Sequence, residues 1–136
     1  MTTTSPIVAL AAGRAVIGSA VFLRPTLLVK GLGGDSATAE RTAWLARMFA
    51  VRDFALGVGV LWALNRSRRG RAATLLGAGL DPMLRELLLL GVLCDAGDAV
   101  AVAGALRGGH VRPLPGGAAL VTGLGAAAVG IAAATR

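Results

Sequence analysis

The chain has 136 residues, of which 55% are hydrophobic and 15% charged, and its mean hydropathy of +0.72 is too high for an ordinary soluble domain. Its length allows one domain of about four membrane spans and leaves no room for a second globular unit. The net charge of +7 would suggest nucleic-acid binding in a soluble protein. Here several basic residues lie within or beside apolar runs, which favours roles in topology and ion pairing, so we expect no nucleic-acid partner.

The apolar runs are continuous and rich in Ala, Leu, Val and Gly, whereas barrel strands alternate apolar and polar residues. We therefore predict an all-α integral membrane four-helix bundle that forms a single domain over residues 1–136. The predicted spans cover about residues 6–23, 43–64, 82–106 and 117–135. We expect a multi-pass membrane protein.

The first predicted span starts with Pro6 in its first turn and has Arg14 at its middle. A secretory signal would place basic residues first and keep its apolar centre uninterrupted, so we expect this span to be retained. On a helical wheel, Arg14 shares a face with Leu10, Ile17, Gly18 and Val21. That face should turn inward, where Gly18 would admit a close neighbouring helix.

The second predicted span contains three charged residues, Arg47, Arg52 and Asp53. A charge inside a span costs at least about 2.5 kcal/mol on insertion scales, so these side chains should face protein or water. The glycine-rich connection before the span carries Asp35 and Ser36, either of which can cap the next helix. An amphipathic lead over residues 38–48 should rise from the membrane interface into the span.

The loop after the second span is the densest basic segment, because four arginines occur in the seven residues NRSRRGR. They are Arg66, Arg68, Arg69 and Arg71. Short loops rich in Lys and Arg stay cytoplasmic, so this loop and both termini should be inside. The same arginines can contact anionic lipid. Residues 72–80 are too few to span and should be interfacial, and Asp81-Pro82 predicts the start of the third span.

The third span carries Asp95 and Asp98, whose three-residue spacing places both carboxylates on one helix face. Arg85 and Glu86 lie near the start of this span and can reach water. Cys94 is the only cysteine, which excludes an internal disulfide and a cysteine pair for metal, and we interpret it as a buried, inert thiol.

The loop before the last span contains the only histidine, His110, which we interpret as solvated because a metal site needs converging partners. The last span is almost entirely Gly, Ala, Val and Leu. Small residues recur in it every four positions, at Ala119, Gly123 and Ala127 and again at Ala126 and Gly130. Such spacing permits close helix contact, so we expect this helix to lie against another protein or a second copy.

Antiparallel spans bring the charged residues to similar depths, with Arg14, Arg52, Asp53 and Asp95 near the midplane. Asp98 and Arg47 should lie further toward the outer face. The predicted intramembrane network therefore has six members, namely Arg14, Arg47, Arg52, Asp53, Asp95 and Asp98. It is either a buried ion-pair network that specifies helix packing or a polar cavity for a proton, an anion or a lipid headgroup.

A resemblance to a known family appears in three segments, GRAVIGSAVFLRP, ARMFAVRDFALGVGVLWAL and LCDAGDAVAV. They resemble small four-helix membrane proteins of unknown function, common in actinobacteria, with an Arg-Asp pair followed by a glycine in the second helix and acidic residues in the third. The matching positions are Arg52, Asp53, Gly57, Asp95 and Asp98. The resemblance covers about residues 11–106 and implies a multi-pass four-helix protein of the bacterial plasma (inner) membrane, without implying an activity.

Three functions remain open from the sequence. The first, which we expect, is an accessory or scaffolding subunit without catalytic chemistry, cofactor or metal, whose partners are membrane lipids and other membrane subunits or a second copy. The second is a small transport or lipid- or ligand-binding bundle that uses the Arg/Asp network. The third is a membrane enzyme acting on a lipid or quinone through Asp95, Asp98 and Cys94. The sequence does not offer a complete catalytic triad, because Ser19 and Thr122 are the only plausible mid-span hydroxyls and the only histidine lies in a loop.

Overall fold

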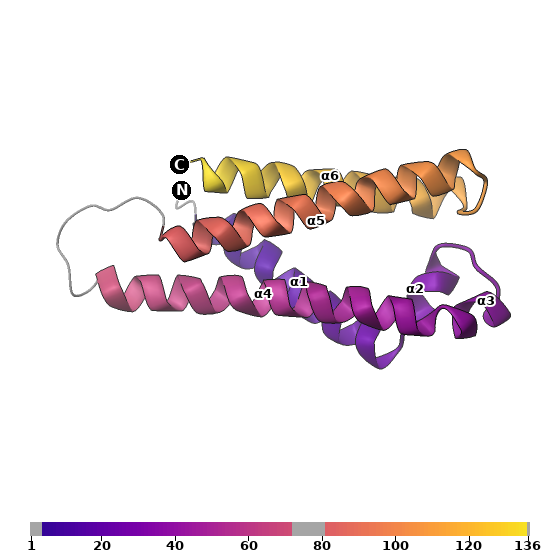
Figure 1. The fold of residues 1–136 in the computed structure, drawn as a ribbon, viewed down its shortest axis with the longest axis horizontal. Coiled ribbons are helices and arrows are strands. Elements are labelled where there is room, and N and C mark those ends of the chain that lie inside the picture. The colour runs from indigo at the N-terminus through magenta and orange to yellow at the C-terminus, as the bar shows by residue number, and fades with distance from the viewer. Residues whose placement is uncertain (1–3, 72–80, 136) are drawn as a thin grey trace.

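The computed structural model describes residues 4–71 and 81–135, and these form α-helices joined by turns, without a strand (Figure 1). The four long helices are α1 (Thr4–Leu23), α4 (Ala43–Arg71), α5 (Pro82–Arg107) and α6 (Pro113–Ala134). Two short helices, α2 (Thr26–Gly31) and α3 (Ser36–Arg41), lie between α1 and α4. All four long helices are long and apolar enough to cross a membrane, which confirms the predicted all-α bundle of four spans.

Two helix boundaries and one connection differ from those predicted. Helix α4 runs on to Arg71 instead of ending near Leu64, because the arginine-rich segment contains no proline to stop it. Helix α6 begins at Pro113, since a proline in the first turn removes only an N–H group that has no helical partner. The connection after α1, expected as a loop, contains α2. The prediction for residues 72–80 lies outside the described residues.

Both aspartates predicted to precede helices act as N-caps. The side chain of Asp35 accepts a hydrogen bond from the Thr38 backbone N–H of α3 at 2.7 Å. The backbone and side chain of Thr38 lower the pKa of the Asp35 carboxyl below its usual value, because their hydrogen bonds stabilise the ionised form. Asp81 accepts from the Met83 N–H at 2.9 Å, with Pro82 in the first position of α5.

Helices α1 and α4 form a close antiparallel pair through two glycines. A Cβ atom added to Gly18 would lie 2.6 Å from the carbonyl oxygen of Ala50, and one added to Gly57 would lie 2.5 Å from that of Ala11. Real Cβ atoms do not approach a backbone oxygen so closely, so only glycine fits at both positions. The predicted close neighbour of Gly18 is thus α4. Ile17, expected on the same inward face, is instead 57% exposed.

The second pair is α5 with α6, which pack through the small residues of α6. A Cβ atom added to Gly130 would lie 2.6 Å from the Val92 side chain, and one added to Gly123 would lie 3.5 Å from the Asp95 carbonyl oxygen. Ala127, on the same face of α6, is only 7% exposed. The expectation that this face is open to another protein is therefore wrong, because α5 of the same chain covers it. Small residues allow close contact without specifying which helix makes it.

The two pairs meet in an apolar core at the end of the bundle that holds both termini (Figure 1). Leu84 is fully buried there, and the Nε atom of Arg85 donates to the carbonyl oxygen of Ala134 at 3.2 Å. The buried members of this core are Ile7, Ala11, Val60, Ala63, Leu64, Leu84, Leu88, Ala133 and Ala134. All four long helices contribute, so this core holds the two pairs together at one end.

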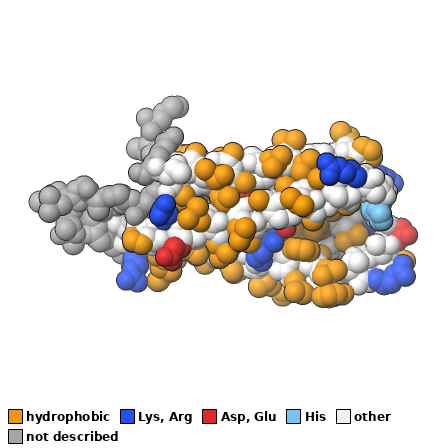
Figure 2. All heavy atoms as spheres, turned by 45° about the horizontal axis from the view of Figure 1, so that its top comes forward, with side chains coloured by type: hydrophobic (Ala, Val, Ile, Leu, Met, Phe, Trp, Pro, Cys, Tyr) orange, Lys and Arg blue, Asp and Glu red, His pale blue; other side chains and the backbone are white. Residues whose placement is uncertain are grey.

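At the opposite end, the α2–α3 connection contacts the loop between α5 and α6. The Arg112 N–H donates to the carbonyl oxygen of Leu32 at 3.3 Å, beside Gly33, whose φ of +98° is unfavourable for other residues. Between the two ends, hydrophobic side chains cover much of the surface (Figure 2). Leu23, Val100 and Val121, for example, are 76%, 73% and 71% exposed, as expected for side chains that face lipid.

Candidate functional site

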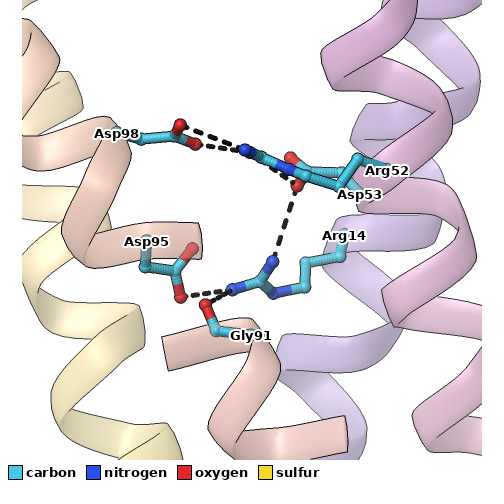
Figure 3. Close-up of polar contacts among 6 residues, drawn as sticks. All are labelled: Arg14, Arg52, Asp53, Gly91, Asp95 and Asp98. Carbon is cyan, nitrogen blue, oxygen red and sulfur yellow. Dashed lines mark hydrogen bonds and ion pairs between the residues drawn. The ribbon is translucent and has the colours of Figure 1, made fainter. Parts of the chain in front are cut away.

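Midway along the bundle, five charged residues from both helix pairs meet, and we call them the charge cluster (Figure 3). They are Arg14 of α1, Arg52 and Asp53 of α4, and Asp95 and Asp98 of α5. At 1.5 Å per residue, each lies within about 5 Å of the midpoint of its span. The cluster is the polar connection between the α1/α4 pair and the α5/α6 pair.

Arg14 holds the buried half of the cluster. Its Nη2 atom donates to Oδ2 of Asp95 and to the carbonyl oxygen of Gly91 at 3.5 Å, and its Nη1 atom lies 3.5 Å from Oδ1 of Asp53. The side chains of Arg14 and Asp95 are only 11% and 12% exposed. This pair therefore lies in the interior, where removing one partner leaves an uncompensated charge.

Arg52 and Asp98 form the exposed half. The guanidinium of Arg52 binds the Asp98 carboxylate through both terminal nitrogens, with Nη1 to Oδ1 at 3.2 Å, and lies 5.3 Å from the ring centre of Phe49. The side chains of Arg52 and Asp98 are 29% and 42% exposed. This ion pair reaches the surface between α4 and α5, and Figure 2 shows basic and acidic side chains among hydrophobic ones midway along the molecule.

Asp53 joins the two halves, because its Oδ1 atom lies 3.5 Å from Nη1 of Arg14 and 3.3 Å from Nη2 of Arg52. Both contacts are longer than an ideal charge-assisted hydrogen bond of about 2.7–2.9 Å. The cluster contains two guanidiniums and three carboxylates, so full ionisation leaves one negative charge in excess. Asp53 is therefore the carboxylate that is held least tightly by any one guanidinium.

A small cavity adjoins the buried half of the cluster. It is lined by Arg14 and Asp95 and by apolar side chains that include Leu56, Val60 and Leu88. About 20 Å³ is open to the centre of a water molecule, which is room for about one water. The carboxylate and guanidinium supply polar partners for such a water, and a larger ligand does not fit in this space.

One predicted member, Arg47, does not join the cluster. Its side chain is exposed near the start of α4, and within the described ranges it makes no ion pair or hydrogen bond. The physical reason is helical geometry, since Arg47 and Arg52 are five residues apart and point about 140° away from each other. Residues at a similar depth in the membrane can therefore lie on different faces of one helix.

Among the described residues, the other candidate groups of the sequence make no ion pair with the cluster, and the two hydroxyls are engaged within their own helices. The hydroxyls of Ser19 and Thr122 donate to carbonyl oxygens of their own helices, at 2.7 and 2.9 Å. Cys94 is half-buried in α5, and His110 is exposed in the loop before α6. The part of the chain that the structure describes contains no group of three or more His, Cys, Asp or Glu side chains arranged so that they could hold a metal ion.

Two contributors to the cluster were not expected from the sequence. The Gly91 carbonyl oxygen accepts from Arg14, and the Phe49 ring flanks Arg52. A sequence signal existed for Gly91, which stands one helical turn before Asp95 on the same face. Of the predicted basic loop, Arg66 lies 5.7 Å from the Trp62 ring centre, while the side chains of Arg68, Arg69 and Arg71 fall outside the described residues.

Comparison of the chain with protein-family models, with curated proteins and with solved structures found no match. Any function must therefore be argued from the geometry of the charge cluster and its surroundings. The resemblance to the actinobacterial four-helix proteins stays a prediction.

Proposed function

We propose that this protein is a non-catalytic accessory or scaffolding subunit of a membrane assembly, in which a partner covers the surface around Arg52 and Asp98. The observation that carries the proposal is the exposure of this ion pair, at 29% and 42%, close to the midpoint of two predicted spans. Hydrocarbon around an isolated bundle would offer these groups no hydrogen-bond partners.

One polar atom of the exposed ion pair has no hydrogen-bond partner. Arg52 Nε is buried and has no hydrogen-bond partner among the described residues. A buried polar group without a partner costs about 1–3 kcal/mol, and a charge in a span costs at least about 2.5 kcal/mol on insertion scales. A polar side chain on a neighbouring helix would reduce the second cost by bonding to the exposed atoms of the pair, which favours association at this surface.

The competing function, a transport or ligand-binding bundle, draws support from the cavity beside Arg14 and Asp95. Its size restricts such a ligand to a proton or about one water molecule. The mutual pairing of guanidiniums and carboxylates favours a structural role for the cluster instead, because charges already satisfied by one another bind a further ion weakly. An enzyme that uses Asp95, Asp98 and Cys94 has less support, since both carboxylates are engaged by arginines.

The same proposal places the protein in the bacterial plasma membrane with both termini cytoplasmic. Its support is the arginine density of residues 65–71 and the resemblance described above. In that orientation α2 and α3 would lie on the outer side, and the exposed ion pair would lie slightly outside the midplane.

The test is a purification in mild detergent, with identification of the chains that co-purify. The informative variant combines Arg52→Gln with Asp98→Asn, because it removes both charges while keeping polar side chains and the net charge of the protein. The control combines Glu86→Gln with Arg107→Gln, two exposed residues at opposite ends of α5. We expect the first variant to lose companions that the control keeps. Identical companions for both variants and the parent would refute the proposed interface.

A further inference from the structure

A second surface feature lies away from the charge cluster, in a groove between α1 and α4 toward the α2–α3 end. Its volume is about 420 Å³, and its lining includes Gly18, Ser19, Phe22, Ala50, Val51 and Phe54. Gly18 and Ala50 touch through their backbones and form a shallow floor, while the larger Phe22 and Phe54 stand at its sides. The groove exists because small residues at the crossing are flanked by aromatic ones.

Arg47 lies beyond the residues that line this groove, on the helix face that they share. It precedes Ala50, Val51 and Phe54 by three, four and seven residues, so it shares their face of α4 one turn nearer the helix start. It lies about 12 Å from the midpoint of its span, near the edge of a hydrocarbon core about 30 Å thick. Its guanidinium is exposed and makes no ion pair or hydrogen bond within the described residues.

A second arginine lies at the same level. The contacts of Gly18 with Ala50 and of Gly57 with Ala11 set the antiparallel register of α1 and α4, and this register places Arg24 opposite the turn that contains Arg47. Residues 24–47 contain four basic and two acidic residues, so this rim is positively charged. An arginine fork matches a phosphate through two parallel hydrogen bonds, which lysine and neutral side chains do not provide.

We propose that this groove is a binding site for an anionic phospholipid, with one acyl chain along Ala50, Val51 and Phe54 and the phosphate on Arg47 and Arg24. The apolar lining fits the chain, and the positive rim fits the headgroup. Arg47 lies a few ångströms inside the edge of the hydrocarbon core, from where its long side chain can reach the lipid phosphates, while the groove lies nearer the midplane. The site is independent of the surface around Arg52 and Asp98, which lies between α4 and α5.

The test uses the full chain in nanodiscs of equal parts phosphatidylglycerol and phosphatidylcholine. The protein is then extracted with mild detergent, and the retained lipids are quantified by mass spectrometry. We expect the parent to retain phosphatidylglycerol preferentially. Arg47→Gln should reduce this preference about fivefold, the effect of about 1 kcal/mol for one arginine near the membrane surface. The matched control, Arg107→Gln, changes an exposed arginine at the same end of the bundle but on α5, away from this groove, and should leave the preference unchanged.

Groove filling tests the chain-binding part. Ser19→Phe on the groove floor and Val51→Phe on its exposed side should each lower retention of the lipid, and thermal unfolding in detergent reports whether each variant is folded. Equal retention of the two lipids by the parent would overturn the site, as would equal losses in Arg47→Gln and Arg107→Gln. Undiminished retention in a folded Val51→Phe variant would overturn the placement of the acyl chain.

Discussion

Gly57 of α4 lies so close to α1 that a Cβ atom added to it would come within 2.5 Å of the Ala11 carbonyl oxygen. We predict that Gly57→Ala destabilises the protein by about 1–3 kcal/mol, because backbone atoms, unlike a flexible side chain, can yield only by separating the helices. Gly97→Ala is the control, since nothing lies within 4 Å of its added Cβ. Thermal unfolding in detergent measures both, and equal melting temperatures would contradict the close crossing.

The buried half of the charge cluster should contribute more to stability than the exposed half. We predict that Arg14→Ala costs about 3–5 kcal/mol, because it leaves the Asp95 carboxylate buried without its partner. Arg52→Ala should cost less, since Asp98 is 42% exposed and can be solvated in detergent. Unfolding of the two variants under the same conditions gives the comparison, and a larger loss for Arg52→Ala would reverse this ranking.

Asp53 should be the most replaceable carboxylate of the cluster. We predict that Asp53→Asn changes the free energy of unfolding by less than about 1 kcal/mol, because it removes the excess negative charge and keeps a hydrogen-bond acceptor. Asp95→Asn serves as the comparison and should cost more, since Asp95 is the nearest carboxylate to Arg14. If the two amide variants are equally destabilised, Asp53 holds the arginines more strongly than its contact distances indicate.

The Asp35 cap of α3 should respond to pH. The pKa of this carboxyl is lowered in the folded protein, chiefly by the hydrogen bond from the Thr38 backbone. Its contribution is therefore fully present above the unfolded-state pKa and is lost as the pH falls through the lower folded-state pKa. Hydrogen exchange over residues 36–41 should accelerate in that acidic range. Asp35→Asn should remove the pH response, and a persistent response would assign it to another group.

The orientation proposed from the basic loop can be tested by cysteine labelling in a Cys94→Ala background. A reagent confined to the outside of intact cells should react with single cysteines in residues 24–42 and 108–112 and should miss residues 65–71, because short arginine-rich loops remain cytoplasmic. Labelling of residues 65–71 before lysis would show the opposite orientation.

The four spans could be predicted from the sequence because they depend on local properties. A continuous apolar run must become a helix in hydrocarbon, where every backbone N–H and C=O needs a partner within its own segment. The caps Asp35 and Asp81 were predictable for the same reason, since each acts on N–H groups two or three residues further along the chain. The midplane depth of Arg14, Arg52, Asp53 and Asp95 followed from the rise per residue alone.

Only the tertiary structure decided which faces of these helices meet. Depth placed Arg47 near Arg52, but the angle of about 140° between them around the axis of α4 turns Arg47 away from the charge cluster. The small residues of α6 indicated close helix packing but not which helix would be the partner. In the structure, α5 of the same chain occupies that face. Rotation and pairing depend on contacts between residues far apart in the chain, such as Gly57 with Ala11 and Arg14 with Asp95, and no local pattern specifies them.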